Sequence, residues 1–225
     1  VAAINLGARY IRGGFYEHVI VVGCDVLSEF VLNGFQSLFA VSETFCQPFD
    51  KDRSGVNLGE GSAAVVLSST PSIFKEVPLS LLDGSISNDA NHISGPSRTG
   101  EGLYRAVKRT MSQYDIQPDQ LGFISAHGTA TVYNDEMEAI AFGRLGLAGV
   151  PINSFKGYVG HTLGAAGVLE VAYTMQCVRQ QWIIQSKGYF DPGTSVQLNV
   201  ITQSQPCQFD MALKTASGFG GCNAA

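Results

Sequence analysis

The sequence contains little charge, and most of what it has is acidic. Charged side chains make up 15% of its 225 residues, against about 25% in an average soluble domain. Fourteen basic and nineteen acidic side chains give a net charge of -5. This excludes nucleic acid as the main partner, because binding phosphates requires clustered lysine and arginine. So little charge also means little solvated surface, and we therefore expect another subunit or further sequence to cover part of the outer surface of this chain.

Other missing features exclude further classes of protein. No apolar run approaches the roughly 18 residues that span a membrane, and the first residues lack the basic leader of a signal peptide. The five cysteines are widely spaced, with no CxxC pair and no histidine at metal-ligand spacing. We therefore expect a cytoplasmic protein with reduced, mostly buried thiols, without a disulfide framework, a metal site or a membrane partner.

Apolar residues make up 45% of the chain, and their spacing predicts short strands that alternate with helices. The β-branched run over residues 18–22 is typical of a strand in a parallel sheet buried on both faces. The predicted strands are 18–22, 63–67, 79–86, 123–126 and 150–153. The predicted helices cover 1–11, a segment capped by Thr99 and ended by Pro118, a segment from Asn134, and one carrying Ala165, Leu169 and Tyr173. This order is that of a layered α/β protein.

Two histidines occupy similar places in this pattern. His127 follows the predicted strand 123–126, and His161 lies in the glycine-rich junction GHTLGAAG. Each alone is more often a core or capping residue, but together, with Lys156 five residues before His161, they indicate an active site. A cation beside an imidazole disfavours the protonated ring, so Lys156 would keep His161 neutral near pH 7. From spacing alone, Lys156 is equally a solvated loop residue.

Four segments resemble, in order and spacing, signatures of the β-ketoacyl-acyl carrier protein synthases of the thiolase superfamily. They are PFDKDRSGVNLGEGSAAVVL (48–67), HGTAT (127–131), NSFKGYVGHTLGAAGVLE (153–170) and GFGGCN (218–223). The resemblance implies a layered αβαβα thiolase-like fold that is incomplete here. Residues 1–70 would end the N-terminal half, and residues 71–225 would form most of the C-terminal half.

The activity implied by the resemblance is a decarboxylative Claisen condensation. An acyl thioester and malonyl-acyl carrier protein would give 3-oxoacyl-acyl carrier protein, in fatty acid, polyene or polyketide elongation. His127 and His161 would promote malonyl decarboxylation and stabilise the enolate oxygen, with Lys156 and Glu170 paired beside them. No dissociable cofactor is implied, because the substrates arrive on the phosphopantetheine arm of the carrier protein.

Substrate-binding roles are also implied by the resemblance. The hydroxyls of Thr129 and Thr131 would bind the pantetheine arm. Phe219, followed by Gly220 in the same turn, would be the gating aromatic, with its backbone N–H in the oxyanion hole. The expected partners are acyl carrier protein and a second ketosynthase chain, in a homodimer or heterodimer. The loop between Phe39 and Pro48 lacks an arginine that often helps to dock the carrier protein.

The nucleophile implied by the resemblance is a cysteine about four residues before Val1, at a helix N-terminus, which favours thiolate. We assign structural roles to all five cysteines present: Cys24, Cys46, Cys177, Cys207 and Cys222. The full-length protein would then be an acyltransferase, and this chain alone would be inactive. The ends of the chain would be cut within the fold.

Three alternatives remain beside the active synthase. A catalytically silent chain-length-factor-like partner would have lost the nucleophile, and the residue at that position before Val1 decides between the two. A thiolase would carry a second cysteine in a CxG turn, where this chain has GFGG. Dinucleotide binding has little support, because Gly143, Gly146 and Gly149 follow a helix rather than open one after a strand. LNGFQSL (32–38) and VNLGEG (56–61) resemble synthases of bacterial aryl-polyene pathways, and the substrate stays open.

Overall fold

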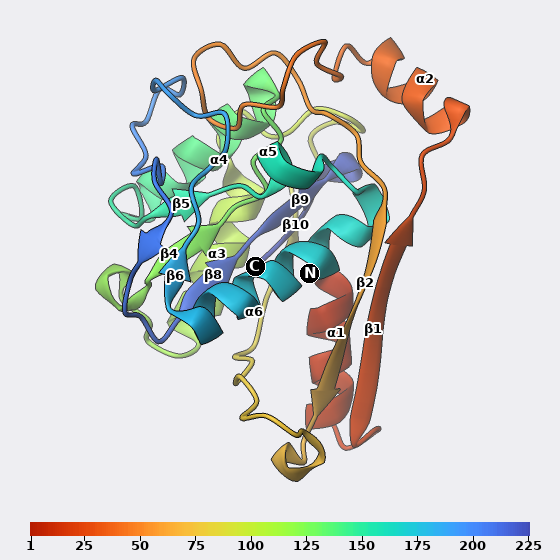
Figure 1. The fold of residues 1–225 in the computed structure, drawn as a ribbon, viewed down its shortest axis with the longest axis vertical. Helices are drawn as coiled ribbons and strands as arrows, with labels where there is room; N and C mark the ends of the chain where they lie inside the picture. Colours follow the sequence, from red (N-terminus) through yellow and green to blue (C-terminus); the bar gives the residue numbers. More distant parts are fainter.

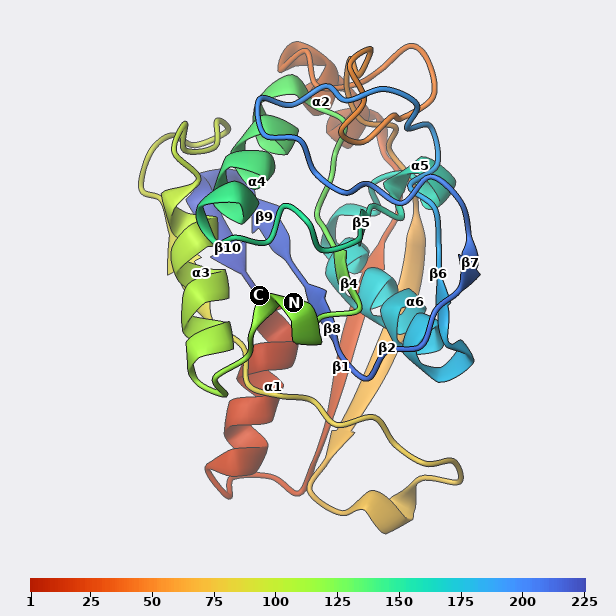
Figure 2. The ribbon, with the colours of Figure 1, turned by 90° about the vertical axis from the view of Figure 1, so that its left-hand side faces the viewer.

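The computed structural model describes residues 1–225 and arranges them in four layers. Figure 1 shows the long strands β1 (His18–Asp25) and β2 (Gly61–Ser68) on one side, then helices α1 (Ala2–Arg12) and α6 (Ala166–Gln180), then a second sheet. Figure 2 shows α3 (Glu101–Ser112) and α4 (Val132–Arg144) beyond that sheet. The predicted layered α/β architecture is confirmed, with a central pair of helices between two sheets.

The second sheet is built from two three-stranded parts. Their strand orders are β3-β10-β9 and β5-β4-β8, and β8 and β9 are consecutive parts of one segment interrupted at Thr215. β4 runs parallel to both β5 and β8, so the C-terminal ends of β4 and β5 lie at the same edge. The strands are β3 (Ile86–Asn88), β4 (Phe123–Ser125), β5 (Ile152–Asn153), β8 (Ala212–Lys214), β9 (Ala216–Gly218) and β10 (Cys222–Ala224).

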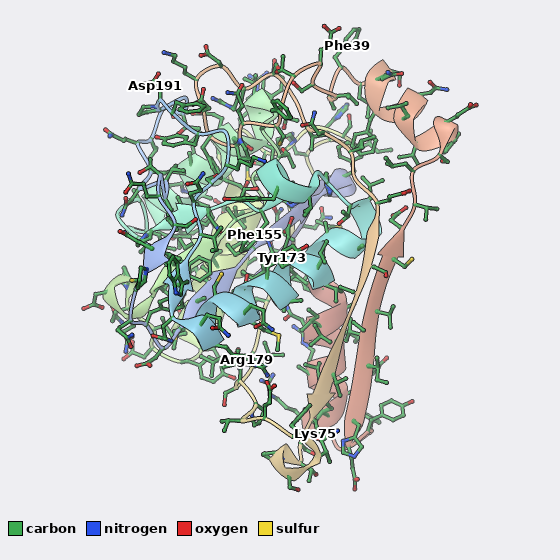
Figure 3. The ribbon with its side chains drawn as sticks, in the orientation of Figure 1. Phe39, Lys75, Phe155, Tyr173, Arg179 and Asp191 are labelled. Atoms are coloured by element: carbon green, nitrogen blue, oxygen red, sulfur yellow. The ribbon has the colours of Figure 1, made fainter.

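Shorter elements connect these layers. They are α2 (Glu29–Ser37), α5 (Lys156–Val159), the strands β6 (Trp182–Ile183) and β7 (Gln205–Pro206), and the 3-10 turns η1 (Pro71–Ile73), η2 (Pro118–Gln120), η3 (Leu163–Ala165) and η4 (Phe219–Gly221). Figure 3 places Phe155 beside Tyr173 of α6, where their rings lie 5.3 Å apart.

None of the helices combines the length and apolar character needed to cross a membrane.

Four hydrophobic clusters form the core. The largest one fills the space between the second sheet and the outer helices, with Leu103, Ile124 and Phe142 fully buried. A smaller one joins Val21 of β1 to Val168 of α6. Burial of this kind contributes about 1.5–3 kcal/mol for each large apolar side chain. Buried packing therefore holds both β4 and α6 in place.

The prediction of a parallel, doubly buried strand at residues 18–22 is wrong. β1 pairs antiparallel with β2, with Val21 opposite Val65, and its side chains alternate between a packed and an open face. Ile20 and Val22 are exposed, whereas Val21 is buried. A continuous β-branched run fits either kind of strand, because the run itself does not say which face is covered. The related prediction for 63–67 is right about a strand, but of those residues only Val65 is buried.

Two further elements differ from the sequence-based prediction. Only Ile86–Asn88 forms a strand in the region where 79–86 was expected. The helix expected after Thr99 is capped instead by Gly100 with φ of 62°, a left-handed conformation that glycine adopts easily. That helix ends at Ser112, well before Pro118, which opens a separate 3-10 turn. The proposed division of the chain at residue 70 stays a prediction.

Candidate active site

His127 lies at the C-terminal end of β4, two residues after the last strand residue, and its side chain is buried. The next residue, Gly128, has φ of 45°, and a Cβ there would lie 2.6 Å from the Cβ of Ser154. Only glycine fits such a close approach in this backbone conformation. Ser154 follows β5 and donates its hydroxyl to the Gly128 carbonyl at 2.7 Å. The loop after β4 is thus pressed against the loop after β5.

Two carboxylates of α4 hold this loop from the other side. Glu138 accepts hydrogen bonds from the backbone N–H groups of His127, at 2.8 Å, and Gly128, at 2.6 Å. Asp135 accepts from Thr129 N–H at 3.0 Å and from Ala130 N–H at 3.1 Å. Both carboxyl groups are fully buried, and burial raises the pKa of Asp135 and raises that of Glu138 to about 7. Hydrogen bonds of this kind each contribute about 0.5–1.5 kcal/mol, and more when the acceptor is charged. The residues 127–131 therefore have a fixed backbone.

Sequence reasoning missed these two anchors. Both residues lie in the segment that was predicted as a helix from Asn134, and neither carboxyl group was predicted to bind the HGTAT loop. The sequence feature that could have predicted them is the spacing of three residues between Asp135 and Glu138. This spacing puts two acids on one face of a helix that directly follows the HGTAT loop.

A buried charge cluster lies beneath His127. Lys156 Nζ donates to Glu170 Oε1 at 2.6 Å and to the His127 carbonyl at 2.6 Å, and it lies 3.2 Å from His127 Nδ1. Lys214 Nζ lies 2.6 Å from the other carboxylate oxygen, Glu170 Oε2. Burial raises the pKa of Glu170, but the two ammonium groups outweigh burial and leave its pKa below the ordinary value. Glu170 is therefore ionised at neutral pH.

The alternative in which Lys156 is a solvated loop residue is wrong, because Lys156 is 1% exposed. Lys156 also contacts His127 directly, and it is the His127 ring, rather than that of His161, that shares a hydrogen bond with it. Lys214 was missed by sequence reasoning, since it lies 44 residues after Glu170 and in a different element. No local pattern connects the two.

The contacts of the two rings fix their tautomers. All three protons of the Lys156 ammonium have acceptors, one of them His127 Nδ1, so that nitrogen is unprotonated. The Leu163 N–H donates to His161 Nδ1 at 3.1 Å. A neutral imidazole with an accepting Nδ1 carries its proton on Nε2. The two rings lie edge to face, with centroids 5.1 Å apart, so the site has two neighbouring Nε2–H donors.

Both histidines are held neutral by their surroundings. Burial, and after it the charge of Lys156, lowers the pKa of His127 well below the ordinary value. The same two causes lower the pKa of His161 to about 3. A neutral ring beside an ammonium group is the expected outcome, since both effects disfavour a second positive charge.

A cavity of about 520 Å³ opens above the two rings. Its lining includes His127, His161, Thr129, Thr131 and Phe219, together with the first residues of α1. The hydroxyls of Thr129 and Thr131 lie 2.9 Å apart and share a hydrogen bond. The structure thus brings together, at one cavity, residues that are 92 positions apart in the chain.

Phe219 lies at the mouth of this cavity and stacks on a second aromatic ring. The partner is Phe35 of α2, with ring centroids 5.6 Å apart and planes 22° from parallel. Gly220 follows with φ of 77°, and its N–H donates to the Ile93 carbonyl at 2.6 Å. Phe35 was not predicted, because the sequence does not show that residues 35 and 219 meet.

The five cysteines are free thiols, but only Cys46 and Cys177 are buried. The expectation that most are buried is therefore wrong, since Cys24 and Cys222 are exposed. Burial raises the pKa of Cys46 to about 12, which leaves it a poor nucleophile. Cys222 lines the cavity, and its sulfur lies 3.5 Å from Asn88 Nδ2. No group of three or more histidine, cysteine, aspartate and glutamate side chains is arranged to hold a metal ion.

Comparison with known proteins identifies the family of this chain. Residues 1–72 match the beta-ketoacyl synthase N-terminal domain, and residues 80–189 match the beta-ketoacyl synthase C-terminal domain. This chain belongs to the beta-ketoacyl synthase family. Both halves of the family pattern occur here in the order found in its members.

Similar synthases come from several lineages. The chain is 31% identical over 255 residues to a putative mitochondrial 3-oxoacyl-acyl-carrier-protein synthase of Schizosaccharomyces pombe, covering 99% of this chain and 57% of that protein. It is 29% identical to the chloroplastic synthase I of Arabidopsis thaliana, covering 96% of this chain and 48% of that protein. The chain thus spans about half the length of these curated synthases.

Solved structures confirm the ketosynthase fold. A ketosynthase in complex with its chain length factor from Xenorhabdus doucetiae matches with a TM-score of 0.91 and 34% identity, covering 99% of this chain and 55% of that one. A beta-ketoacyl synthase from Burkholderia phymatum matches with a TM-score of 0.93 and 26% identity, covering 99% and 57%. The thiolase-like fold expected from the sequence is confirmed, for about half of a synthase chain.

Proposed function

We propose that the protein containing this chain is a β-ketoacyl-acyl carrier protein synthase that condenses an acyl thioester with malonyl-acyl carrier protein. The observation that carries the proposal is the pair of neutral histidines, each with its Nε2–H free above the Lys156 and Glu170 cluster. Two such donors match the needs of a reaction in which negative charge develops on one thioester oxygen.

In this mechanism a cysteine thiolate first attacks the acyl thioester, the acyl C–S bond of the donor breaks, and the thiolate of the donor's pantetheine arm leaves. The malonyl C–C bond to the carboxylate then breaks, carbon dioxide leaves, and the electron pair passes to the enolate. His127 and His161 donate to the enolate oxygen. The enolate carbon attacks the acyl thioester, a C–C bond forms, and the cysteine leaves as thiolate. Hydrogen-bond or acid–base roles of this kind contribute about 10²- to 10⁴-fold each.

The remaining cavity residues are proposed to bind the substrate. Thr129 and Thr131 would hydrogen-bond the phosphopantetheine arm of an acyl carrier protein, and no other cofactor is proposed. The Phe219 ring would gate the acyl channel, and the turn through Gly220 would present the Phe219 N–H to the thioester oxygen. The cavity lining supports these roles, because it joins both threonines to Phe219 and the two histidines.

We propose that the nucleophilic cysteine lies about four residues before Val1. The first residues of α1 line the same cavity as His127 and His161, and the free N–H groups at a helix N-terminus favour a thiolate. Sequencing of the gene upstream of the Val1 codon tests this point directly. A cysteine about four residues before Val1 is expected, and its absence would favour the silent partner described below.

The decisive experiment uses the full-length protein with acyl- and malonyl-carrier proteins and mass spectrometry of the products. We expect a product two carbons longer with a 3-oxo group. His127→Ala should slow malonyl decarboxylation by about 10²- to 10⁴-fold, while the matched change at the exposed His18 should leave it unchanged. Decarboxylation at the parent rate in His127→Ala would refute the assigned role of this ring.

The alternative is a silent, chain-length-factor-like subunit. It is favoured by one finding, the likeness to a chain in a solved complex of a ketosynthase with its chain length factor. Both histidines, Lys156 and Glu170 are present, however, and arranged as a polar site. We therefore propose an active cytoplasmic subunit, paired either with a second copy or with a related chain, and size-exclusion analysis of the purified protein distinguishes these states.

A further inference from the structure

Lys214 is a buried basic residue for which the proposed mechanism has no role. It ends β8, is 9% exposed, and its Nζ donates to two backbone carbonyls, Ser125 at 3.2 Å and Ala126 at 3.0 Å. Its third neighbour is Glu170 Oε2 at 2.6 Å. An ammonium group removed from water requires such compensation, because an unpaired buried charge is strongly unfavourable.

The three oxygens around Lys214 form the kind of set that binds a hard cation. Backbone carbonyls together with a carboxylate are typical oxygen ligands of such ions in proteins. Glu170 Oε2 accepts no aligned hydrogen bond, so the ion pair with Lys214 is its compensation. The Lys214 ammonium therefore fills an oxygen-lined cation position with a group of the protein itself.

This position is directly connected to the proposed catalytic residues. Ser125 and Ala126 immediately precede His127 in the chain, and Glu170 holds Lys156 through its other oxygen. Lys156 in turn contacts the His127 ring and carbonyl. One ammonium group thus fixes the end of β4 and the carboxylate that orients Lys156.

We propose that Lys214 is a positioning residue whose ammonium group occupies a built-in monovalent cation site and thereby fixes Glu170 and the β4 end beneath His127. The kinetic consequence rests on the proposed function, but the cation site itself does not. If Lys214 is removed, the site should accept a small monovalent cation from solution. If Lys214 only fills space, an apolar side chain of similar length should replace it.

The experiment compares Lys214→Ala, Lys214→Met and a matched control, Lys51→Ala, in the full-length protein. Lys51 is exposed and also pairs with a carboxylate, Asp191, at 2.8 Å. Thermal unfolding is measured in ammonium chloride, potassium chloride and choline chloride at equal ionic strength. Choline is the control cation because it is too large for a site that an ammonium group fills.

We expect Lys214→Ala in choline chloride to unfold about 6 °C or more below the parent protein. Ammonium or potassium should restore most of this difference in the alanine variant and little of it in Lys214→Met, whose side chain occupies the space. The parent protein and Lys51→Ala should unfold alike in the three salts. If Lys214→Ala does not fold in choline, folding that returns only with ammonium or potassium supports the proposal equally.

Several outcomes would overturn the proposal. They are a Lys214→Ala variant that responds equally to the three salts, one that folds in none of them, and a Lys214→Met variant as stable as the parent. A second readout is the rate of malonyl decarboxylation, which should fall about 10²-fold in Lys214→Ala with little change in KM and recover with ammonium or potassium. If the full-length parent does not decarboxylate malonyl at all, the proposed function fails, whereas the salt dependence of unfolding still tests the cation site.

Discussion

Replacing Glu170 with glutamine should destabilise the protein much more than the same change at Glu101. Both carboxylates bind two cations, Lys156 and Lys214 at 2.6 Å in one case and two surface arginines at 2.7 Å in the other. Glu170 is buried and Glu101 is not. A glutamine amide accepts from one ammonium, but its NH₂ group faces the second, which leaves a buried charge unpaired.

Loss of one partner from a buried ion pair costs about 3–5 kcal/mol, and with two dependent ammonium groups we expect the upper end of this range. Urea unfolding of the full-length protein, followed by circular dichroism at pH 7, measures the difference. Glu101→Gln should move the midpoint very little, because exposed pairs are screened by solvent. Equal losses in the two variants would show that the buried cluster contributes no more than a surface network.

The pH dependence of the same pair of proteins gives an independent check. The pKa of Glu170 is lowered in the folded state from its ordinary value of 4.5, so its contribution to stability is complete above that ordinary value, which applies in the unfolded state. It is lost as the pH falls through the lower folded-state value. The stability difference between the parent and Glu170→Gln should therefore narrow below about pH 4.5. A difference that stays constant down to pH 3 would contradict the ion-pair explanation.

Three further predictions concern catalysis in the full-length protein. His127→Ala should slow malonyl decarboxylation by about 10²- to 10⁴-fold, measured as release of carbon dioxide. Lys156→Met should raise the pKa of His127, because the ammonium group of Lys156 contributes to lowering it. The acid limb of the pH–rate profile should therefore move to higher pH, and an unmoved limb would contradict this expectation. Phe35→Ala should free the Phe219 ring from its stacking partner and change the preferred acyl chain length, and an unaltered product distribution would show that Phe35 does not hold the gate.

The parts of the site that follow directly on a strand or belong to a short motif were predictable from the sequence. His127 comes at the end of an apolar run, and His161 lies in a glycine-rich junction, so their positions follow from local patterns. The pairing of Lys156 with Glu170 came from the family resemblance and is present at 2.6 Å. Local order along the chain is sufficient for such features.

The parts that were missed depend on which distant segments meet. Lys214 reaches Glu170 only because β8 lies beside β4 in the sheet, and Phe35 reaches Phe219 only because α2 folds over the cavity. The same limit explains the error over β1. Its β-branched run predicts a strand, but the partner strand and the covered face are set by tertiary packing. Residue type predicted the elements, while the contacts between them required the structure.

The charges beneath the histidines explain why neutral rings serve this chemistry. Lys156, Lys214 and Glu170 form a buried cluster of two basic side chains and one acidic side chain. Burial, and after it the charge of Lys156, lowers the pKa of His127 and of His161 and keeps both rings neutral. In the proposed mechanism, the two basic side chains would favour an anionic malonyl group and the enolate that follows it. Removal of Lys214 would make the cluster neutral, and removal of Glu170 would leave two unpaired ammonium groups. Lys214 is therefore the residue that leaves this three-residue cluster with more basic than acidic side chains, while the imidazole donors above it remain uncharged.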